Sequence, residues 1–287
     1  AVANVVIHAG NSATLFAEAG QELFTSSDDG DHWVPFEGST DMGSIDATSL
    51  RSDGNGGVRL RGTGGAFHLS RDASTWTADT VADRLETERA VQLPVPVPPT
   101  TVARVGRDRR VLIASIGGIA AVAKKETPSL WRSIDDGATW TRAHTLKVWM
   151  FSSCCTLLVD PGDPDTVYAI ATGMVVGGGG AQEFRSRDAG VSWTELRTPG
   201  FTGPFATLPT TPTSLIGQTY QGFAMSRDHG DTWTTTKAGP PEGAVLVGDV
   251  SRPLVVFAGT SYRGVYRSIA GGLTWQPTGR VTDRPSR

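Results

Sequence analysis

Short apolar segments separated by turn-forming residues run along the whole chain, and the last stretch shows this pattern most clearly. Residues 244–247 form an uninterrupted apolar run, and the segments 254–259, 265–268 and 274–277 follow it in close succession. These segments are rich in valine, threonine and aromatic residues, which favour strands over helices. The pattern therefore predicts a unit of four short strands joined by tight turns.

The same pattern of four segments can be traced in five earlier stretches of the chain. The predicted strands are 4–8, 14–18, 23–26 and 33–36; 47–50, 57–62, 66–70 and 76–79; 101–105, 111–116, 130–133 and 140–142; 156–159, 167–171, 183–186 and 193–196; and 205–208, 214–218, 223–226 and 233–235. Six four-stranded antiparallel units predict an all-β fold, a six-bladed β-propeller, in which radial closure protects the sheet edges.

We expect a single domain over residues 1–287. Its blades would lie at about 1–38, 39–82, 101–146, 154–200, 201–240 and 241–280. All four strands of the first unit follow the N-terminus, and all four of the last unit precede the C-terminus. Closure of the ring would therefore depend on packing of the first blade against the last. The alternative is a seven-bladed ring with a degenerate blade in 80–100, but four prolines between 94 and 99 argue against a central strand there.

Each third predicted strand leads into the pattern Ser-x-Asp-x-Gly-x-x-Trp. The pattern is intact at 26–33, 133–140, 186–193 and 226–233. The copy at 70–76 lacks the glycine and one residue of spacing, and the copy at 268–275 has Ala270 in place of the aspartate. The six copies begin 40 to 63 residues apart, a spacing typical of repeat architectures.

The residue types in this pattern are those that stabilise a turn. Serine and aspartate side chains accept hydrogen bonds from nearby backbone amides, glycine adopts a positive φ, and tryptophan has a large surface to bury between blades. We therefore assign the pattern a structural role, and neither a catalytic nor a calcium-binding one, because its carboxylates belong to different blades. The residues with this role are Asp28, Trp33, Asp72, Trp76, Asp135, Trp140, Asp188, Trp193, Asp228, Trp233 and Trp275.

Ser-x-Asp-x-Gly-x-x-Trp resembles the Asp-box, or BNR repeat, of a family of β-propellers. This family includes sialidases, sortilin-type receptors, the photosystem II assembly factor of the Ycf48 type and many exported bacterial propellers. The resemblance covers the whole chain and implies that each box lies on the turn between the third and fourth strands of a blade. We expect an exported protein, periplasmic or extracellular, whose leader has been removed, because of this resemblance and because the chain begins at Ala1 without a methionine.

Composition excludes some functions and leaves others open. The formal net charge of −3 gives no strong field for nucleic acid, and no apolar run reaches the length of a transmembrane helix. The five histidines are scattered, and no metal-ligand spacing occurs, so we expect neither a metal nor a cofactor.

The two cysteines, Cys154 and Cys155, are adjacent. They are compatible with a strained bridge that contacts a ligand, a redox element, a soft-metal site or two ordinary thiols on opposite sides of a strand.

The longest connections all fall on one face of the predicted ring, opposite the boxes. They are the links between blades at 81–100 and 146–155 and the loops within blades at 117–129 and 172–182. We expect the loop at 172–182, which is rich in glycine, to be a mobile flap. Loops on a rigid scaffold are where binding is usually located. The candidate binding residues on this face are Arg84, Arg89, Lys124, Lys125, Lys147, Trp149, Phe151, Cys154, Cys155, Met174, Tyr220, Tyr262 and Arg263.

Two classes of function fit this organisation. The first is an exported binding scaffold that holds a protein or glycan partner with the loop-rich face of blades two to four. The alternative is a glycoside hydrolase or polysaccharide lyase of sialidase-like fold, with its site at the mouth of the channel and with Glu86, Glu88, Glu183 and Tyr262 as candidates. A sialidase proper is disfavoured, because the Phe-Arg-Ile-Pro type motif that carries the first substrate-binding arginine of that family is absent. We expect no nucleic-acid partner, and the oligomeric state stays open.

Overall fold

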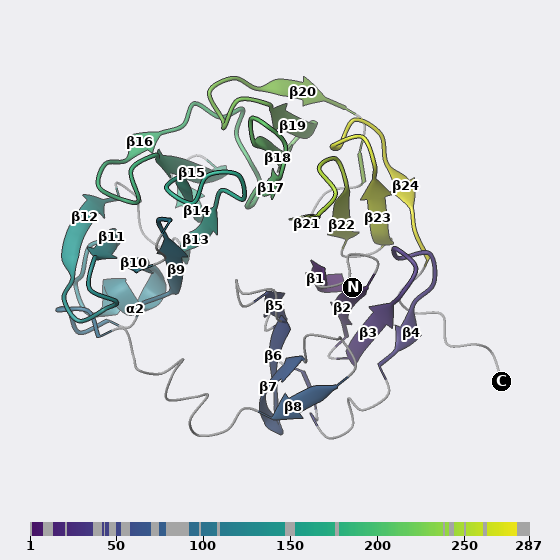
Figure 1. Ribbon diagram of the computed structural model, residues 1–287, viewed down its shortest axis with the longest axis horizontal. Coiled ribbons are helices and arrows are strands. Elements are labelled where there is room, and N and C mark those ends of the chain that lie inside the picture. Colours follow the sequence, from purple (N-terminus) through teal and green to yellow (C-terminus); the bar gives the residue numbers. More distant parts are fainter. Residues whose placement is uncertain are drawn as a thin grey trace.

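The structure is a computed structural model. It describes residues 2–7, 14–20, 22–36, 42, 44–45, 50–52, 58–69, 75–78, 92–97, 99–107, 110–146, 153–175, 178–237, 239–240, 244–249, 251–260 and 263–279. Six four-stranded antiparallel sheets, each built from four consecutive strands, are arranged around a common centre (Figure 1). The first strand of each sheet is innermost and the fourth is outermost. The predicted six-bladed all-β propeller is therefore confirmed.

The strands of each blade are short and follow one another closely. Blade 1 holds β1 (Val2–Ile7), β2 (Leu15–Ala19), β3 (Glu22–Ser26) and β4 (Val34–Pro35); blade 2 holds β5 (Arg51–Ser52), β6 (Val58–Gly62), β7 (Gly65–Leu69) and β8 (Trp76–Ala78); and blade 3 holds β9 (Thr101–Val105), β10 (Val111–Ile116), β11 (Ser129–Ser133) and β12 (Thr141–Thr145). Blade 4 holds β13 (Ser153–Val159), β14 (Val167–Val175), β15 (Gly178–Ser186) and β16 (Thr194–Glu195); blade 5 holds β17 (Ala206–Leu208), β18 (Ser214–Thr219), β19 (Gly222–Ser226) and β20 (Thr234–Thr236); and blade 6 holds β21 (Val245–Gly248), β22 (Val256–Thr260), β23 (Gly264–Ser268) and β24 (Gln276–Pro277).

In blades 1, 3, 4, 5 and 6, whose boxes the structure describes, the box forms the turn between the third and fourth strands, as predicted. In blade 1, the Ser26 hydroxyl accepts a hydrogen bond from the Gly30 amide at 2.9 Å and donates one to Asp28 at 2.8 Å. Asp28 in turn accepts the amide of His32 at 2.9 Å. Gly30 has a φ of 88°, which explains the glycine at this position. The same bonds recur in the boxes of blades 3, 4 and 5.

The box tryptophan packs against the preceding blade in five of the six interfaces. Trp233 of blade 5 packs on a cluster that includes Tyr168 and Ile170 of blade 4, and Trp275 of blade 6 lies 5.2 Å from Phe223 of blade 5. An arginine directly before the box serine adds a second contact in three interfaces. Arg185, for example, donates to the carbonyl of His229 in the next box at 2.7 Å.

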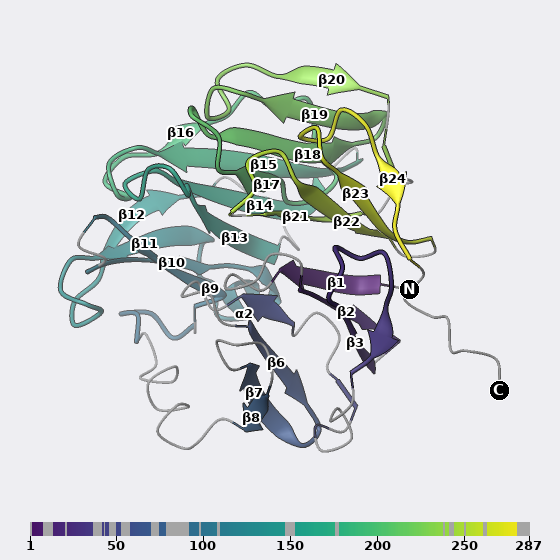
Figure 2. The ribbon, with the colours of Figure 1, turned by 45° about the vertical axis from the view of Figure 1, so that its right-hand side comes forward.

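Blade 1 closes the ring by packing against blade 6, and each of these two sheets consists of consecutive strands among the described residues. Strand β1 lies beside β22 (Figure 2). Trp33 packs with Val255 and Phe257. The Arg252 guanidinium binds both carboxylate oxygens of Asp29 at 2.7 Å and also reaches the buried Asp249 at 2.6 Å. An apolar seam and a shared arginine thus take the place of an interlocked strand, as the sequence pattern predicted.

Blades 2 and 3 differ from the other neighbouring blades. Because the damaged box of blade 2 is one residue shorter, His68, two residues before Ser70, pairs with Thr77, whereas in blade 4 the residue directly before the serine has this role. Counted from the box tryptophan, the register of blade 2 is nevertheless that of blade 1, where Phe24 pairs with the second residue after Trp33. Phe67 therefore packs towards blade 1 as Phe24 packs towards blade 6, and Arg59, directly opposite His68, lies on the side away from blade 1.

The corresponding side of blade 3 is covered by its own preceding segment. Leu93 and Val97 pack against Leu112 and Trp140, which occupy the positions that face a preceding blade elsewhere in the ring. In the described part of the chain, no cluster of buried residues joins blade 2 to blade 3. Among the described residues, the repeated packing between blades is therefore absent only between blades 2 and 3.

Some predicted boundaries and loops are wrong. The inner strand of blade 2 is Arg51–Ser52, outside the predicted 47–50, and β13 begins at Ser153. The predicted loop 117–129 contains a short helix, α2 (Gly118–Ala123), which is favoured by its three alanines and by the burial of Ala121. The predicted flap 172–182 is a continuation of the hairpin of β14 and β15. Among the described residues, no helix is long and apolar enough to cross a membrane.

Replacing Arg252 by methionine should weaken the closure of the ring. The change leaves the carboxylate of Asp29 without its bidentate partner and removes one donor from the buried Asp249, so we expect the free energy of unfolding to fall by about 2 kcal/mol. Urea denaturation measures the change. The control is Arg107→Ala, which removes an exposed ion pair with Asp165 and should cost less than about 0.5 kcal/mol. Equal losses in the two variants would contradict the role of Arg252.

Candidate functional site

The two faces of the ring carry different sets of connections. The turns between first and second strands bind the boxes, as when the Ala189 amide donates to the Asp165 carbonyl at 2.8 Å. The links between blades instead bind the hairpins between second and third strands, as when the Thr202 amide donates to the Gln218 carbonyl at 2.9 Å. We call the first of these the box face and the second the loop face.

The most prominent feature of the loop face is the hairpin of β14 and β15 in blade 4. Both strands have nine residues and pair from Val167 opposite Ser186 to Val175 opposite Gly178. The third strands of the other five blades have five residues each. The surplus extends the sheet of blade 4 beyond those of its neighbours. This regular pairing replaces the mobile flap that the glycine content suggested.

A second structured insertion, α2, lies on the same face in the adjacent blade 3. It contacts β13, the inner strand of blade 4. Ala121 faces the core of blade 3, whereas Val122, Lys124 and Lys125 are exposed. The two predicted binding lysines therefore lie on the loop face beside the blade that carries the long hairpin. Both insertions are ordered elements and not simple extensions of a loop.

Cys155 lies at the base of this hairpin, where β13 begins. Ser153 pairs with Thr172 and Thr156 pairs with Ile170, so Cys154 and Cys155 together stand opposite Ala171 and form a β-bulge. Cys155 is 2% exposed and disulfide-bonded. Its carbonyl accepts hydrogen bonds from the hydroxyls of Thr101 and Ser115 in blade 3, at 2.5 and 3.4 Å. Cys155 is therefore part of the junction between blades 3 and 4, and it is not the exposed contact predicted.

Glu183, a predicted catalytic candidate, lies inside the protein. It is 1% exposed, in a position three residues before the box serine where the intact blades otherwise carry apolar residues. Those residues are Leu23, Leu130, Phe223 and, in blade 6, Val265. One carboxylate oxygen accepts the Thr198 hydroxyl at 2.9 Å, and the other is buried without a hydrogen-bond partner. Burial raises the pKa of Glu183 to about 7, although the bond from Thr198 acts in the opposite direction.

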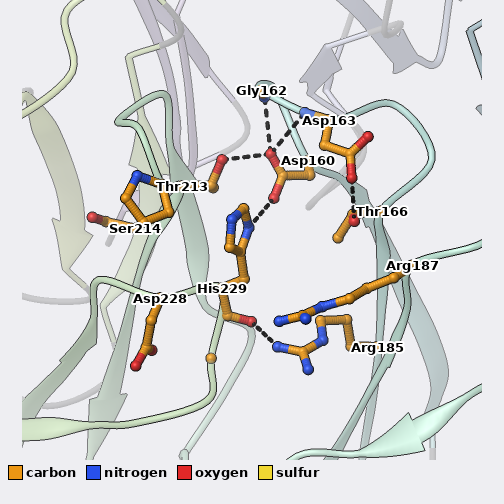
Figure 3. A network of polar contacts seen from close by, with 12 residues as sticks. Asp160, Gly162, Asp163, Thr166, Arg185, Arg187, Thr213, Ser214, Asp228 and His229 are labelled. Atoms are coloured by element: carbon orange, nitrogen blue, oxygen red, sulfur yellow. Dashed lines mark hydrogen bonds and ion pairs between the residues drawn. The ribbon is translucent and has the colours of Figure 1, made fainter.

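A polar network around Asp160 was not predicted (Figure 3). The buried Asp160 carboxylate accepts the amides of Gly162 and Asp163 and the hydroxyl of Thr213, and it lies 3.0 Å from Nδ1 of His229. Although an aspartate beside a histidine resembles part of a catalytic triad, this pair lies on the box face. It joins the first turn of blade 4 to the box of blade 5, so its role is structural.

The sequence does contain a signal for this arrangement. Asp160 and Asp249 both follow the inner strand of a blade, and each precedes a proline by four residues. Both aspartates accept the backbone amides two and three residues later. The Tyr168 hydroxyl donates a hydrogen bond to Asp160. Burial raises the pKa of Tyr168, and the negative charge of Asp160 and this hydrogen bond raise it further. The shared Asp-x-x-x-Pro pattern therefore marks turns that connect blades.

The other predicted site residues are partly visible. Tyr220, 62% exposed, and Arg263 occupy corresponding hairpin turns of blades 5 and 6 on the loop face. Cys154 and Met174 lie in β13 and β14. The remaining candidates and one box residue lie outside the described residues: Arg84, Glu86, Glu88, Arg89, Lys147, Trp149, Phe151, Tyr262 and Asp72. In the part of the chain that the structure describes, no group of three or more His, Cys, Asp or Glu residues could hold a metal ion.

Comparisons with known proteins give similar structures but no close relative. No protein-family model and no curated protein matches the chain. A GH74 xyloglucanase from Xanthomonas campestris is 16% identical, with a TM-score of 0.31 over 100% of this chain and 57% of its own. A structure of YCF48 bound to D1 peptide is 15% identical, with a TM-score of 0.46 over 99% of this chain and 82% of its own. A Hadza microbial sialidase is 14% identical, with a TM-score of 0.48 over 96% and 64%.

The chain spans a little over half the length of the xyloglucanase. All of these TM-scores are below 0.5, so the fold assignment depends on the sheet topology described above.

The raised pKa of Glu183 predicts a pH dependence of stability. Because the pKa of this carboxyl rises from 4.5 to about 7 on folding, the unfolded chain loses the proton at a lower pH than the native chain does. The free energy of unfolding therefore falls as the pH rises from about 4.5 to 7. Glu183→Gln should remove this loss and raise the stability at pH 8 by roughly 3 kcal/mol relative to the natural chain. Urea denaturation of both chains between pH 5 and 8 measures how the free energy of unfolding depends on pH. Glu195→Gln, an exposed neighbour, is the control, and an unchanged pH profile in Glu183→Gln would contradict the assignment.

Proposed function

We propose that this chain is an exported propeller of the Asp-box family that acts as a binding scaffold for a macromolecular partner. The observation that carries the proposal is the pair of ordered insertions on neighbouring blades, α2 and the long β14–β15 hairpin, on the face opposite the boxes. Insertions placed together on a rigid ring are typical of a binding surface. The box face, in contrast, is occupied by the repeated turns that hold the blades together.

The chemistry of the loop face favours binding through backbone and side-chain hydrogen bonds. Lys124, Lys125, Tyr220 and Arg263 supply exposed donors around the hairpin. Tyrosine and arginine are enriched in protein interfaces, where they combine apolar surface with donors. Protein and glycan partners both fit this set of groups.

Glycan hydrolysis is the second candidate function, and Glu183 is the observation that favours it. A carboxyl with a pKa near 7 has the property required of a general acid. However, Glu183 is buried between blades 4 and 5, and its bonded partner is Thr198 of the link between them. A carboxyl in this position reaches no substrate at the mouth, so we rank hydrolysis below binding.

We also propose that Cys154 and Cys155 form a bridge with each other. Cys155 is disulfide-bonded, and the sequence contains only two cysteines. A bridge between the two residues of the bulge would stiffen the base of the hairpin. Alkylation without prior reduction, followed by mass spectrometry, should then label neither cysteine, whereas two labelled thiols would contradict the proposal.

The binding proposal is tested by crosslinking from defined positions. A photoreactive amino acid is placed at Lys124 or Tyr220 on the loop face, and at Ile134 or Val191 on the box face, where both are more than 60% exposed. In an extract of the cells that produce the chain, we expect the two loop-face variants to label one shared partner and the box-face variants to label none. A glycan array run in parallel detects sugar binding. Labelling from the box face alone, or release of sugar from the array, would contradict the proposal.

A further inference from the structure

The outer edge of the long hairpin carries unpaired backbone groups in the described structure. Strand β16 pairs only with Phe184 and Arg185 of β15, and the Leu196 amide donates to the Glu183 carbonyl at 2.7 Å. Backbone groups alternate in direction along a strand, so those of Gly179 and Ala181 point to the same side as those of Glu183, away from β14. Among the described residues, no strand pairs with β15 on this side between Gly178 and Gln182.

The sequence of this edge lacks the residues that usually prevent another strand from pairing with it. Natural sheet edges are usually protected by lysine, proline, a bulge or a very short strand. The segment 178–182 reads Gly-Gly-Gly-Ala-Gln, with no charge, no proline and almost no side-chain bulk. It is regularly paired with β14 along its whole length, without a bulge. The edge therefore offers flat, ordered donors and acceptors to an incoming chain.

We propose that this edge binds an extended segment of a partner protein, which adds a strand to blade 4 beside Gly179 and Ala181. The proposal rests on the proposed function and identifies the partner as a polypeptide. An extended polypeptide alone has donors and acceptors at the spacing that Gly179 and Ala181 present. A sugar lacks this periodic pattern.

The neighbouring link between blades 4 and 5 restricts the shape of the occupant. Leu196 and Thr198 of this link both bind Glu183, at the end of the open segment. The link therefore runs directly beside the edge. A single extended chain can lie in this position, whereas the edge of a second whole propeller would meet the link. For this reason a flexible segment of a partner, and not a second copy of this chain, is the expected occupant.

The test compares two substitutions at one position. Gly179→Pro removes the outward amide and leaves the pairing of β14 with β15 intact, because that amide does not point towards β14. Gly179→Ala also adds side-chain atoms at this position but keeps the backbone amide, so it is the matched control for Gly179→Pro. Thermal melts of both variants verify folding. Ala181→Pro is a second variant at the next outward amide.

The probe is a displayed library of random nine-residue peptides, selected on the whole immobilised chain. For the best synthetic peptide, we expect Gly179→Pro to weaken the Kd at least tenfold and Gly179→Ala to change it less than twofold. N-methylation of alternate peptide residues should weaken binding, and methylation of the residues between them should not, because only alternate amides face the edge.

Three outcomes would overturn the proposal. They are equal binding by both Gly179 variants, failure to select any peptide that depends on the Gly179 amide, and a dimer of the natural chain that Gly179→Pro dissociates. Crosslinks from Lys124 and Tyr220 that persist in Gly179→Pro would show that the loop face binds its partner by another route, and the proposed function would then stand without this inference. If the photoreactive variants at Lys124 and Tyr220 label no partner while Gly179 is unchanged, both the proposed function and this inference are contradicted.

Discussion

The contact between a box and the preceding blade, made in five of the six blades, is the interaction on which the ring depends. The box serine and aspartate hold the turn, and the turn fixes the position of the tryptophan, which packs on the neighbouring sheet. Where an arginine precedes the serine, it binds the carbonyl of the next box and ties the two turns together. Each unit alone would leave one side of a small sheet exposed, so the blades are stable only as a closed series.

The first and last blades obey the same rule, and this explains how the ring closes without an exchanged strand. Arg252 and Arg267 both contact Asp29, which belongs to the box of blade 1. The exception lies between blades 2 and 3, where no cluster of buried residues among those described joins the two sheets. There the segment containing Leu93 and Val97 covers blade 3 in place of a neighbouring sheet.

The repeated features could be read from the sequence, because each is local. Strand order, box geometry and the division into two faces follow from the spacing of Ser26, Asp28, Gly30 and Trp33 and of their counterparts. The site was harder to predict. Glycine content suggested a flap at 172–182, but ladder pairing with β14 overrides that tendency. The burial of Glu183 also escaped prediction, because Thr198, which binds it, belongs to a link whose path no local pattern determines.

The contacts that join the blades and the surplus strand length of blade 4 lie on opposite faces of the ring. Asp160, His229 and the boxes hold blades together on one face, and the surplus strand length of blade 4 extends from the other. The most direct test is amide hydrogen exchange of the whole chain measured by NMR. Without a partner, the Gly179 and Ala181 amides should exchange fast while those of Gly180 and Gln182 exchange slowly, and a bound partner should slow the first pair as well. Slow exchange at Gly179 in the free chain, or partner protection confined to the box turns, would contradict the account.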